Sequence, residues 1–283
     1  LVAPTAGPGH LPGSAPSSPA AQAALDGGAG GDAEARLVAR PYTDEESEEA
    51  RRLANFFGAT PQNARPIALW LIGPSAVGKS TISDQAAQEF GIPRAAGPSG
   101  AWIPDAVTVD GEFFRAVHRG YQDWIRTPDW RAAYPALKPR INEAKSAMSR
   151  DAVGQRKHLV IPHTALEVDE CLREMREFSG AGYTNHVMGV MAPREAVAAR
   201  GRQREREAGK RYASDEYDRS LAAFRPLMSS CNGRYEVVFV KPLPQAGGGT
   251  RRMSYEVLTT GAGPTDEPNI PPLPDRASPG GQP

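Results

Sequence analysis

The stretch that decides the fold is Gly73-Pro-Ser-Ala-Val-Gly78-Lys79-Ser80-Thr81, which matches the pattern G-x-x-x-x-G-K-[ST] in full. It lies between a short apolar run, residues 66–72, and a helical stretch, residues 79–90, which is the context that the pattern requires. Its glycines let backbone N–H groups gather at the positive end of a helix, where phosphate oxygens bind. The sequence therefore predicts a phosphate-binding loop whose nucleotide contacts come from Gly73, Ser75, Ala76, Val77, Gly78, Lys79, Ser80 and Thr81.

The same loop predicts the cofactors ATP and Mg²⁺. Lys79 is expected to reach the β- and γ-phosphates, and Ser80 is the predicted metal ligand through its hydroxyl. Thr81 either adds a phosphate contact or only caps the helix. GTPases and ATPase motors share such a loop, but the sequence has no Asn-Lys-x-Asp motif and no clear strand ending in Asp-Asp or Asp-Glu. The pattern therefore favours a kinase.

Further apolar runs alternate with helical stretches along the chain. The predicted strands are 66–72, 106–110, 157–161, 185–191 and 235–240, and the predicted helices are 43–57, 79–90, 113–125, 138–152, 165–178 and 194–207. Strands that alternate with helices form a mostly parallel sheet covered on both faces. The fold class is thus predicted to be α/β, a P-loop kinase-like parallel sheet with helices on both faces.

The two ends of the chain differ in composition from the middle. Residues 1–38 are rich in Ala, Gly, Pro and Ser and residues 261–283 are rich in Pro, so both are predicted to be disordered tails around one domain, residues 39–260. The start without Met and the composition of the first tail suggest a processed piece, a linker or a delivery segment. Two cysteines, Cys171 and Cys231, are expected to be free thiols rather than a disulfide framework.

The overall charge and hydropathy exclude several partners. Lys plus Arg equals Asp plus Glu, at 33 each, which argues against nucleic acid as the main partner. No run approaches the roughly 20 apolar residues of a membrane span, and no His or Cys grouping has structural-zinc spacing. The expected location is cytoplasmic, with secretion or translocation into a target cell as an effector as the alternative.

Asp110 ends the second predicted strand and opens the segment Asp110-Gly-Glu-Phe-Phe-Arg115-Ala-Val-His118. Ligand chemistry collects at the carboxyl ends of parallel strands, and phosphoryl transfer needs a base within reach of the acceptor hydroxyl. Asp110 is therefore the predicted catalytic base, a role compatible with capping the next helix. Glu112 is interpreted as a first-turn helix acid.

Arginines crowd the helical stretch 194–207 and the residues that follow it. Phosphoryl transfer spreads negative charge over the equatorial oxygens, and arginines on a mobile lid can stabilise that charge. Arg200, Arg204 and Arg211 are the candidates for this catalytic role. A solvated helix face, with arginines paired to Glu195, Glu205 and Glu207, is the alternative.

A P-loop followed by a strand that ends in Asp-Gly-Glu-Phe-Phe-Arg, with His118 and Tyr121 soon after, resembles the zeta-toxin family of small-molecule kinases over residues 66–240. The resemblance implies phosphorylation of the sugar of UDP-N-acetylglucosamine, with Lys79 and Ser80 on the donor, Asp110 as base and Arg115 on the acceptor. The chain departs from the family at Ile161-Pro-His-Thr164, where many members have Glu-Gly-Thr, and this departure puts the sugar pocket in doubt.

A smaller branch of the same superfamily also looks similar, namely secreted effectors that phosphorylate NAD on its adenosine ribose. The similar stretches are Tyr121-Gln-Asp-Trp124, Pro128-Asp-Trp130, Asn142-Glu-Ala-Lys145 and the Pro-His-Thr turn. The acceptor is thus predicted to be NAD or a UDP-sugar, and its predicted contacts are Asp110, Arg115, His118, His163 and Thr164. A surface or capping role is the alternative for His118. A neutralising antitoxin or a chaperone is a further candidate partner, and the charge balance and hydropathy predict that neither nucleic acid nor a membrane is one.

Two other function classes stay open. The chain could be an ATP-binding module that acts through protein contacts without turnover, with its charged helix and Pro-rich tails as partner surfaces. It could also be an ATPase coupled to movement, which the missing strand-terminal acidic pair argues against.

Overall fold

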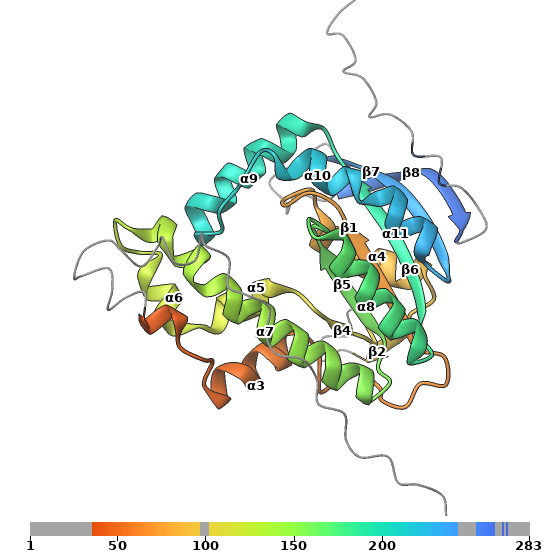
Figure 1. Cartoon of the computed structure of the whole chain (residues 1–283), viewed down its shortest axis with the longest axis horizontal. Helices are drawn as coiled ribbons and strands as arrows, with labels where there is room; N and C mark the ends of the chain where they lie inside the picture. The colour runs from red at the N-terminus through yellow and green to blue at the C-terminus, as the bar shows by residue number, and fades with distance from the viewer. Residues whose placement is uncertain (1–35, 97–101, 243–252, 264–267, 269, 271–283) are drawn as a thin grey trace, which may run out of the picture.

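The computed structural model describes residues 36–96, 102–242, 253–263, 268 and 270. Its centre is a six-stranded sheet with the strand order β4-β5-β1-β6-β7-β8 (Figure 1). The strands are β1 Ile67–Ile72, β4 Val107–Thr108, β5 Leu159–His163, β6 Thr184–Met191, β7 Arg234–Pro242 and β8 Met253–Ala262. All neighbours pair in parallel except β8, which is antiparallel to β7. The predicted mostly parallel sheet is confirmed.

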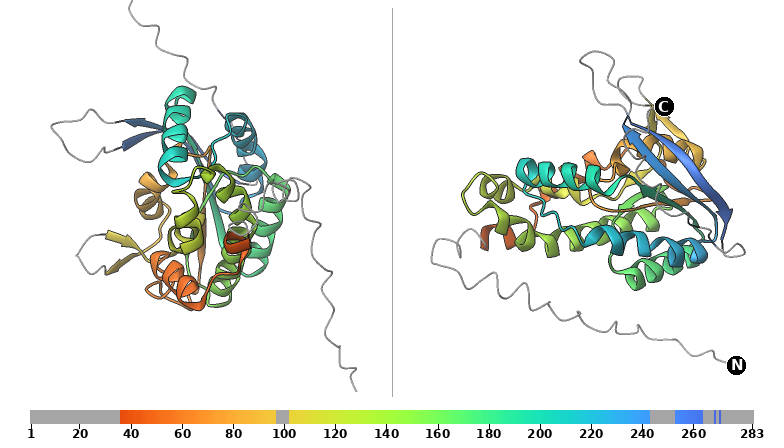
Figure 2. Two further views of the ribbon diagram at one scale, coloured as in Figure 1. Left: turned by 90° about the vertical axis from the view of Figure 1, so that its left-hand side faces the viewer. Right: turned by 90° about the horizontal axis from the view of Figure 1, so that it is seen from above.

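Helices cover both faces of this sheet (Figures 1 and 2). They are α3 Asp44–Leu53, α4 Lys79–Glu89, α5 Gly111–Val117, α6 Arg119–Trp124, α7 Ala133–Gly154, α8 Val168–Gly180, α9 Arg194–Ala208, α10 Glu216–Ala222 and α11 Phe224–Ser230. A 3₁₀ turn, Trp130–Ala132, precedes α7, and a separate hairpin pairs β2 Arg94–Ala96 with β3 Trp102–Pro104. The predicted P-loop kinase-like architecture, with helices on both faces, is confirmed.

Strand β1 is buried on both faces because its sequence, IALWLI, is continuously apolar. Successive side chains of a strand point to opposite faces, so Trp70 packs into the cluster that holds Phe178 of α8 and Phe224 of α11. Leu71 packs into the other cluster, with Ile82 of α4. The strand that carries the phosphate loop is thus fixed between two helical layers.

The carboxyl ends of the central strands meet at one edge of the sheet. Ile72 at the end of β1 is in register with His163 of β5 and with Gly189 of β6. Asp110 follows β4, the strand beside β5. The phosphate loop and the predicted base therefore lie at the same edge.

Several elements differ from the sequence-based expectations. The helix predicted over 113–125 is two helices, α5 and α6, because the His118 side chain accepts the N–H of Tyr121 and starts a second helix. The strand predicted at 157–161 is found two residues later, as β5. The sequence analysis did not predict β8, the β2–β3 hairpin, α10 or α11.

The predicted tails lie mostly outside the described residues. Of the first tail only residues 36–38 are described, as part of a helical turn, and β8 ends at Ala262, two residues beyond the predicted domain boundary. Cys171 and Cys231 are buried free thiols, as predicted. Among the residues that the structure describes, no helix has both the length and the apolar character needed to cross a bilayer.

Candidate functional site

The phosphate loop has a backbone that only particular residues allow. Gly73 passes so close to β6 that a Cβ at this position would lie 2.4 Å from the carbonyl oxygen of Val190. Gly78, the N-cap of α4, has a φ of 113° and Ala76 has a φ of 64°, both in the left-handed region. The turn thus directs the first N–H groups of α4 outward, as a phosphate-binding nest requires.

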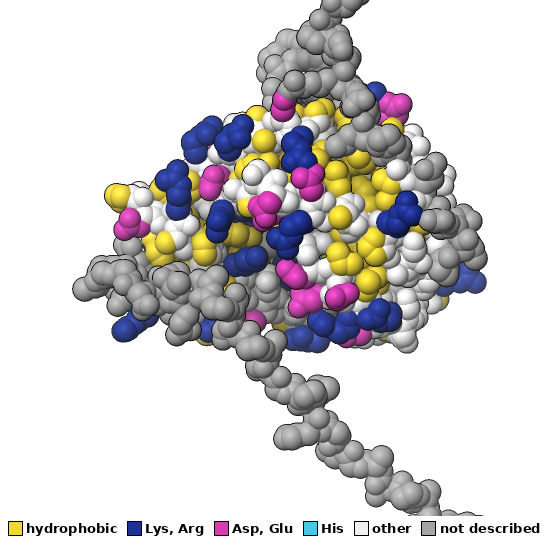
Figure 3. All heavy atoms as spheres, turned by 45° about the horizontal axis from the view of Figure 1, so that its top comes forward, with side chains coloured by type: hydrophobic (Ala, Val, Ile, Leu, Met, Phe, Trp, Pro, Cys, Tyr) yellow, Lys and Arg dark blue, Asp and Glu magenta, His cyan; other side chains and the backbone are white. Residues whose placement is uncertain are grey.

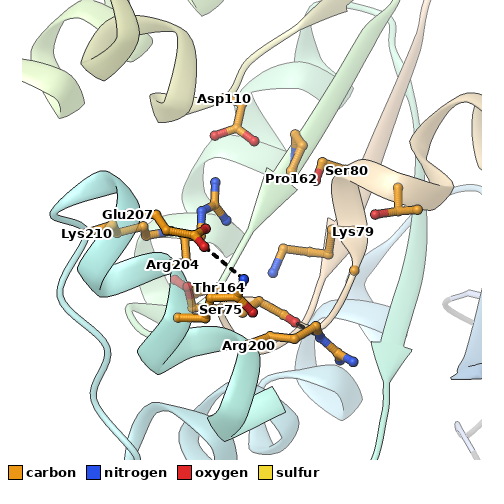
Figure 4. A pocket seen from close by; sticks show the side chains of 14 residues that line it. Ser75, Lys79, Ser80, Asp110, Pro162, Thr164, Arg200, Arg204, Glu207 and Lys210 are labelled. Carbon is orange, nitrogen blue, oxygen red and sulfur yellow. Dashed lines mark hydrogen bonds between the residues drawn. The ribbon is translucent and has the colours of Figure 1, made fainter. Parts of the chain in front are cut away.

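A cavity of about 320 Å³ opens directly over this loop (Figure 4). One wall is the loop with the first turn of α4, and the opposite wall is α9. Its lining residues are Ser75, Ala76, Gly78, Lys79, Ser80, Thr81, Asp110, Pro162, Thr164, Arg200, Gln203, Arg204, Glu207 and Lys210. The structure thus brings most of the predicted nucleotide contacts together with Asp110 and two of the three predicted lid arginines.

Lys79 and Ser80 occupy the floor of the cavity. The Lys79 Nζ donates to the carbonyl oxygens of Gly73, at 2.6 Å, and Pro74, at 2.8 Å. Burial and the cation of Lys210 lower the pKa of Lys79 to about 7. A phosphate group at this place would offer the ammonium a stronger partner than two carbonyls, because hydrogen bonds between ionised groups are stronger.

Asp110 stands across the cavity from Lys79 (Figure 4). It is the N-cap of α5, and its Oδ1 accepts the N–H of Glu112 at 2.9 Å. Burial by itself would raise the pKa of Asp110, but this hydrogen bond and nearby cations outweigh burial and hold the pKa below its ordinary value. The carboxylate is therefore ionised at neutral pH.

The cations that act on Asp110 are Lys210, Arg115 and Lys145, from three different elements. Arg115 on α5 is 5% exposed, and its guanidinium lies 5.8 Å from the ring centre of Tyr134. Within the described part of the chain, no carboxylate comes within ion-pair distance of any of these three cations. Beside Asp110 there is thus an excess of positive charge.

Two of the three predicted lid arginines, Arg200 and Arg204, line the cavity from α9. The Arg200 Nε donates to the carbonyl oxygen of Ala76 at 2.9 Å, which ties the helix to the phosphate loop. Arg204 lines the cavity, whereas Arg211 is exposed and does not. Lys210, which the sequence analysis named only as part of the basic cluster, takes its place in the cavity wall.

Two other lining residues of α9, Gln203 and Glu207, were not predicted, and they form a hydrogen bond of 2.8 Å with each other. The surface around α9 carries Lys and Arg side chains interspersed with Asp and Glu, so it is not uniformly basic (Figure 3).

The predicted acceptor contacts fall into two groups. Thr164 lines the cavity, and its carbonyl oxygen accepts the Ser220 hydroxyl at 2.6 Å. His118 does not line the cavity: it is fully buried, caps α6 and packs edge-on against Tyr42 at 5.2 Å between ring centres. The structure thus gives His118 the capping role that the sequence analysis kept as its alternative.

His163 lies behind Thr164 at the end of β5. Its Nδ1 accepts the N–H of Ala165 at 3.0 Å and lies 3.4 Å from the Sγ of Cys171. Burial, together with the nearby cation of Lys145, lowers its pKa to about 3. The imidazole is therefore neutral at neutral pH, and His163 is not among the residues that line the cavity.

A family model described as an AAA domain matches residues 69–227, more than half of the chain. The chain belongs to this AAA domain family. The match begins within β1 and ends within α11, so it includes the phosphate loop, Asp110 and α9. No protein among the curated sequences matches the chain.

Two solved structures are similar to this chain to different degrees. A structure from the PezAT chromosomal toxin–antitoxin system of Streptococcus pneumoniae is similar with a TM-score of 0.52 and 21% identity, over 71% of this chain and 78% of that chain. The AvrRxo1-ORF1:AvrRxo1-ORF2 complex with sulphate ions has a TM-score of 0.46 and 15% identity, over 80% and 70% of the two chains. At 21% identity, the likeness to the PezAT structure concerns the fold alone.

Proposed function

We propose that this protein is an ATP-dependent kinase that transfers the γ-phosphate to a sugar hydroxyl of a nucleotide metabolite, NAD at its adenosine ribose or UDP-N-acetylglucosamine. The observation that carries the proposal is the position of Asp110. A P-loop alone would suit any nucleotide hydrolase, but here an ionised carboxylate faces the loop across the cavity. Such a carboxylate is what an acceptor hydroxyl needs.

The residues over the loop fit ATP with Mg²⁺. The N–H groups at the start of α4 and the ammonium of Lys79 would hold the phosphates, and Ser80 places a hydroxyl oxygen in the same cavity. Oxygen donors of this kind suit Mg²⁺, which when bound neutralises charge on the β- and γ-phosphates. The magnesium role of Ser80 therefore remains part of this proposal.

In the proposed transfer, Asp110 orients the acceptor hydroxyl and receives its proton as the oxygen attacks the γ-phosphorus. The new O–P bond forms while the bond to the β-γ bridging oxygen breaks, and ADP leaves with that electron pair. Arg204, which lines the cavity from α9, would stabilise charge on the transferring group. Asp110 then returns its proton to solvent.

The acceptor side favours an anionic molecule. Arg115 is buried without a carboxylate partner in the described structure, and a buried charge without compensation is costly. Lys145 adds to the excess of positive charge beside Asp110. Phosphate groups next to the reacting sugar would offset this charge, and both proposed acceptors carry two phosphates there.

We also propose a biological setting. The PezAT relative belongs to a toxin–antitoxin system. Phosphorylating a common nucleotide would deplete it, so this chain would act as a toxin in the cytoplasm of the cell in which it works, reached by translocation if it is an effector. An antitoxin or a chaperone would restrain it until then.

The test is to incubate the protein with ATP, Mg²⁺ and either NAD or UDP-N-acetylglucosamine and to search by mass spectrometry for a product heavier by one phosphate. Asp110→Asn should lower kcat by about 10²–10⁴-fold while it retains ATP binding. The matched control is Glu143→Gln, at an exposed carboxylate of α7 that pairs with Arg140.

Full activity in Asp110→Asn toward every acceptor would show that the base is wrongly assigned. ATP binding without turnover across a metabolite panel would favour the binding-module alternative, and rapid hydrolysis without any acceptor would favour an ATPase.

A further inference from the structure

An ion pair connects α9 to α5, and its arginine, Arg204, lines the cavity. The Nη2 of Arg204 donates to the Oε2 of Glu112. Glu112 also donates its backbone N–H to Asp110 at 2.9 Å. A single turn of α5 therefore carries both the proposed base and the partner of the proposed lid arginine.

The backbone of α9 is fixed at both ends of the segment that carries Arg204. Toward its start, Arg200 is bonded to the phosphate loop through the carbonyl oxygen of Ala76. At its end, the Tyr121 hydroxyl of α6 donates to the carbonyl oxygen of Ala208 at 2.7 Å.

The turn after α9 is packed equally closely. Gly209 has a φ of 64°, and a Cβ there would lie 2.5 Å from Ile125. What remains free to vary is the long Arg204 side chain itself, which has many rotamers when nothing holds it.

We propose that Glu112 is a positioning residue that holds the Arg204 guanidinium over the cavity, beside Asp110, where the phosphoryl group would pass from donor to acceptor. The inference rests on the proposed function and deepens it. The pair is half-exposed, with Arg204 30% and Glu112 51% accessible, so it is weak enough to yield to a phosphate of higher charge. The pair thus orders the Arg204 side chain before ATP binds, and Arg204 can still leave Glu112 to contact phosphate.

This role predicts a particular kinetic effect. Without Glu112, each turnover must first order Arg204, so kcat falls by about fivefold, the size expected when a half-exposed ion pair is lost. The contacts of the P-loop with ATP are unchanged, so the KM for ATP stays within about twofold. In an Arg204→Ala background the same substitution should have no further effect.

The competing role is structural, because Glu112 is also an acid in the first turn of α5. Two variants separate the roles. Glu112→Asp keeps the negative charge in the first turn but lacks the reach to Arg204, and Glu112→Gln keeps the length but loses the charge. Glu143→Gln serves again as the control for removing an exposed, paired carboxylate.

The experiment measures kcat and KM for the three variants, alone and with Arg204→Ala, together with the affinities for ADP and for ADP with Mg²⁺ and aluminium fluoride. We expect both Glu112 variants to lower kcat and to weaken binding of the fluoride complex about fivefold, with ADP affinity unchanged. Normal kcat in Glu112→Asp, or an equal loss in the Arg204→Ala background, overturns the inference. An inactive wild-type protein would instead overturn the proposed function itself, so the two failures are distinct.

Discussion

Lys210 offers a test of the cavity that does not depend on the identity of the acceptor. It follows the turn at Gly209 and lines the cavity, and burial, with the cations of Arg115 and Arg204, lowers its pKa to about 8. Roughly nine tenths of the molecules then carry the charge at pH 7 and about one tenth at pH 9. A charged hydrogen bond to phosphate contributes about 1.5–3 kcal/mol, so Lys210→Met should weaken binding of MgATP by about 10- to 100-fold at pH 7.

The sign of the pH effect follows from the same pKa. Phosphate binds the protonated amine, so the advantage of wild type over Lys210→Met is complete below pH 8 and falls by about tenfold per unit above it. Because the cation of Lys210 also lowers the pKa of Lys79, Lys210→Met alters the titration of Lys79 as well, and Lys210→Arg, which keeps a cation beside Lys79 at every pH, separates the two effects. Titration calorimetry at pH 6.5, 8 and 9.5 measures the ratio of the affinities of the two proteins, and Lys210→Arg should abolish its pH dependence. A ratio that is constant across this range would refute the role of Lys210 at the phosphates.

Two further predictions concern the sheet beneath the site. Asn185 is 1% exposed, and its side-chain oxygen accepts the indole N–H of Trp70 at 3.0 Å. Asn185→Leu should therefore lower the free energy of unfolding, measured by urea denaturation, by about 1–3 kcal/mol. The control Asn142→Leu, at an exposed position, should change it by less than about 0.5 kcal/mol. Equal effects of the two substitutions would contradict the buried bond. Gly73→Ala would force a Cβ against the carbonyl of Val190. Calorimetry should therefore show ATP binding weakened at least about tenfold, and the free energy of unfolding should fall by about 1–3 kcal/mol. Unchanged ATP affinity would show that the loop does not need this close approach.

The parts of the fold that could be predicted from the sequence are those that neighbouring residues in the chain specify by themselves. The apolar run at 66–72 joined to Gly73-x-x-x-x-Gly78-Lys79 specifies a buried strand, a tight turn and a helix without help from distant residues. Asp110 was predicted because an acidic residue at a strand end is visible in the chain itself. Its position across the cavity from Lys79 then follows from the parallel order of β4, β5 and β1.

The sequence-based predictions were wrong where the local structure depends on a contact with distant residues or on an unusual capping side chain. Helix α5 ends at His118 because this imidazole, which is not among the preferred capping side chains, accepts the N–H of Tyr121, the third residue of the next helix. Whether Lys210 or Arg211 faces the cavity depends on the left-handed turn at Gly209, which the charge pattern alone does not contain. Strand β8 pairs antiparallel with β7 at the edge of the sheet, and the sequence reading assigned no strand there although Tyr, Val and Thr in this segment favour one.

The charges around Asp110 also determine what kind of base it would be. Because the hydrogen bond from the N–H of Glu112 and three cations hold the pKa of Asp110 below its ordinary value, the carboxylate has little tendency to take a proton in the ground state. A strong base is not needed if the transition state is loose, since the hydroxyl then loses its proton late, after the bond to the leaving group has largely broken. The same hydrogen bond and cations that weaken Asp110 as a base keep it ionised, so it can accept the hydrogen bond that aims the hydroxyl at phosphorus. Orientation, rather than proton affinity, is therefore the contribution that this site is built to make.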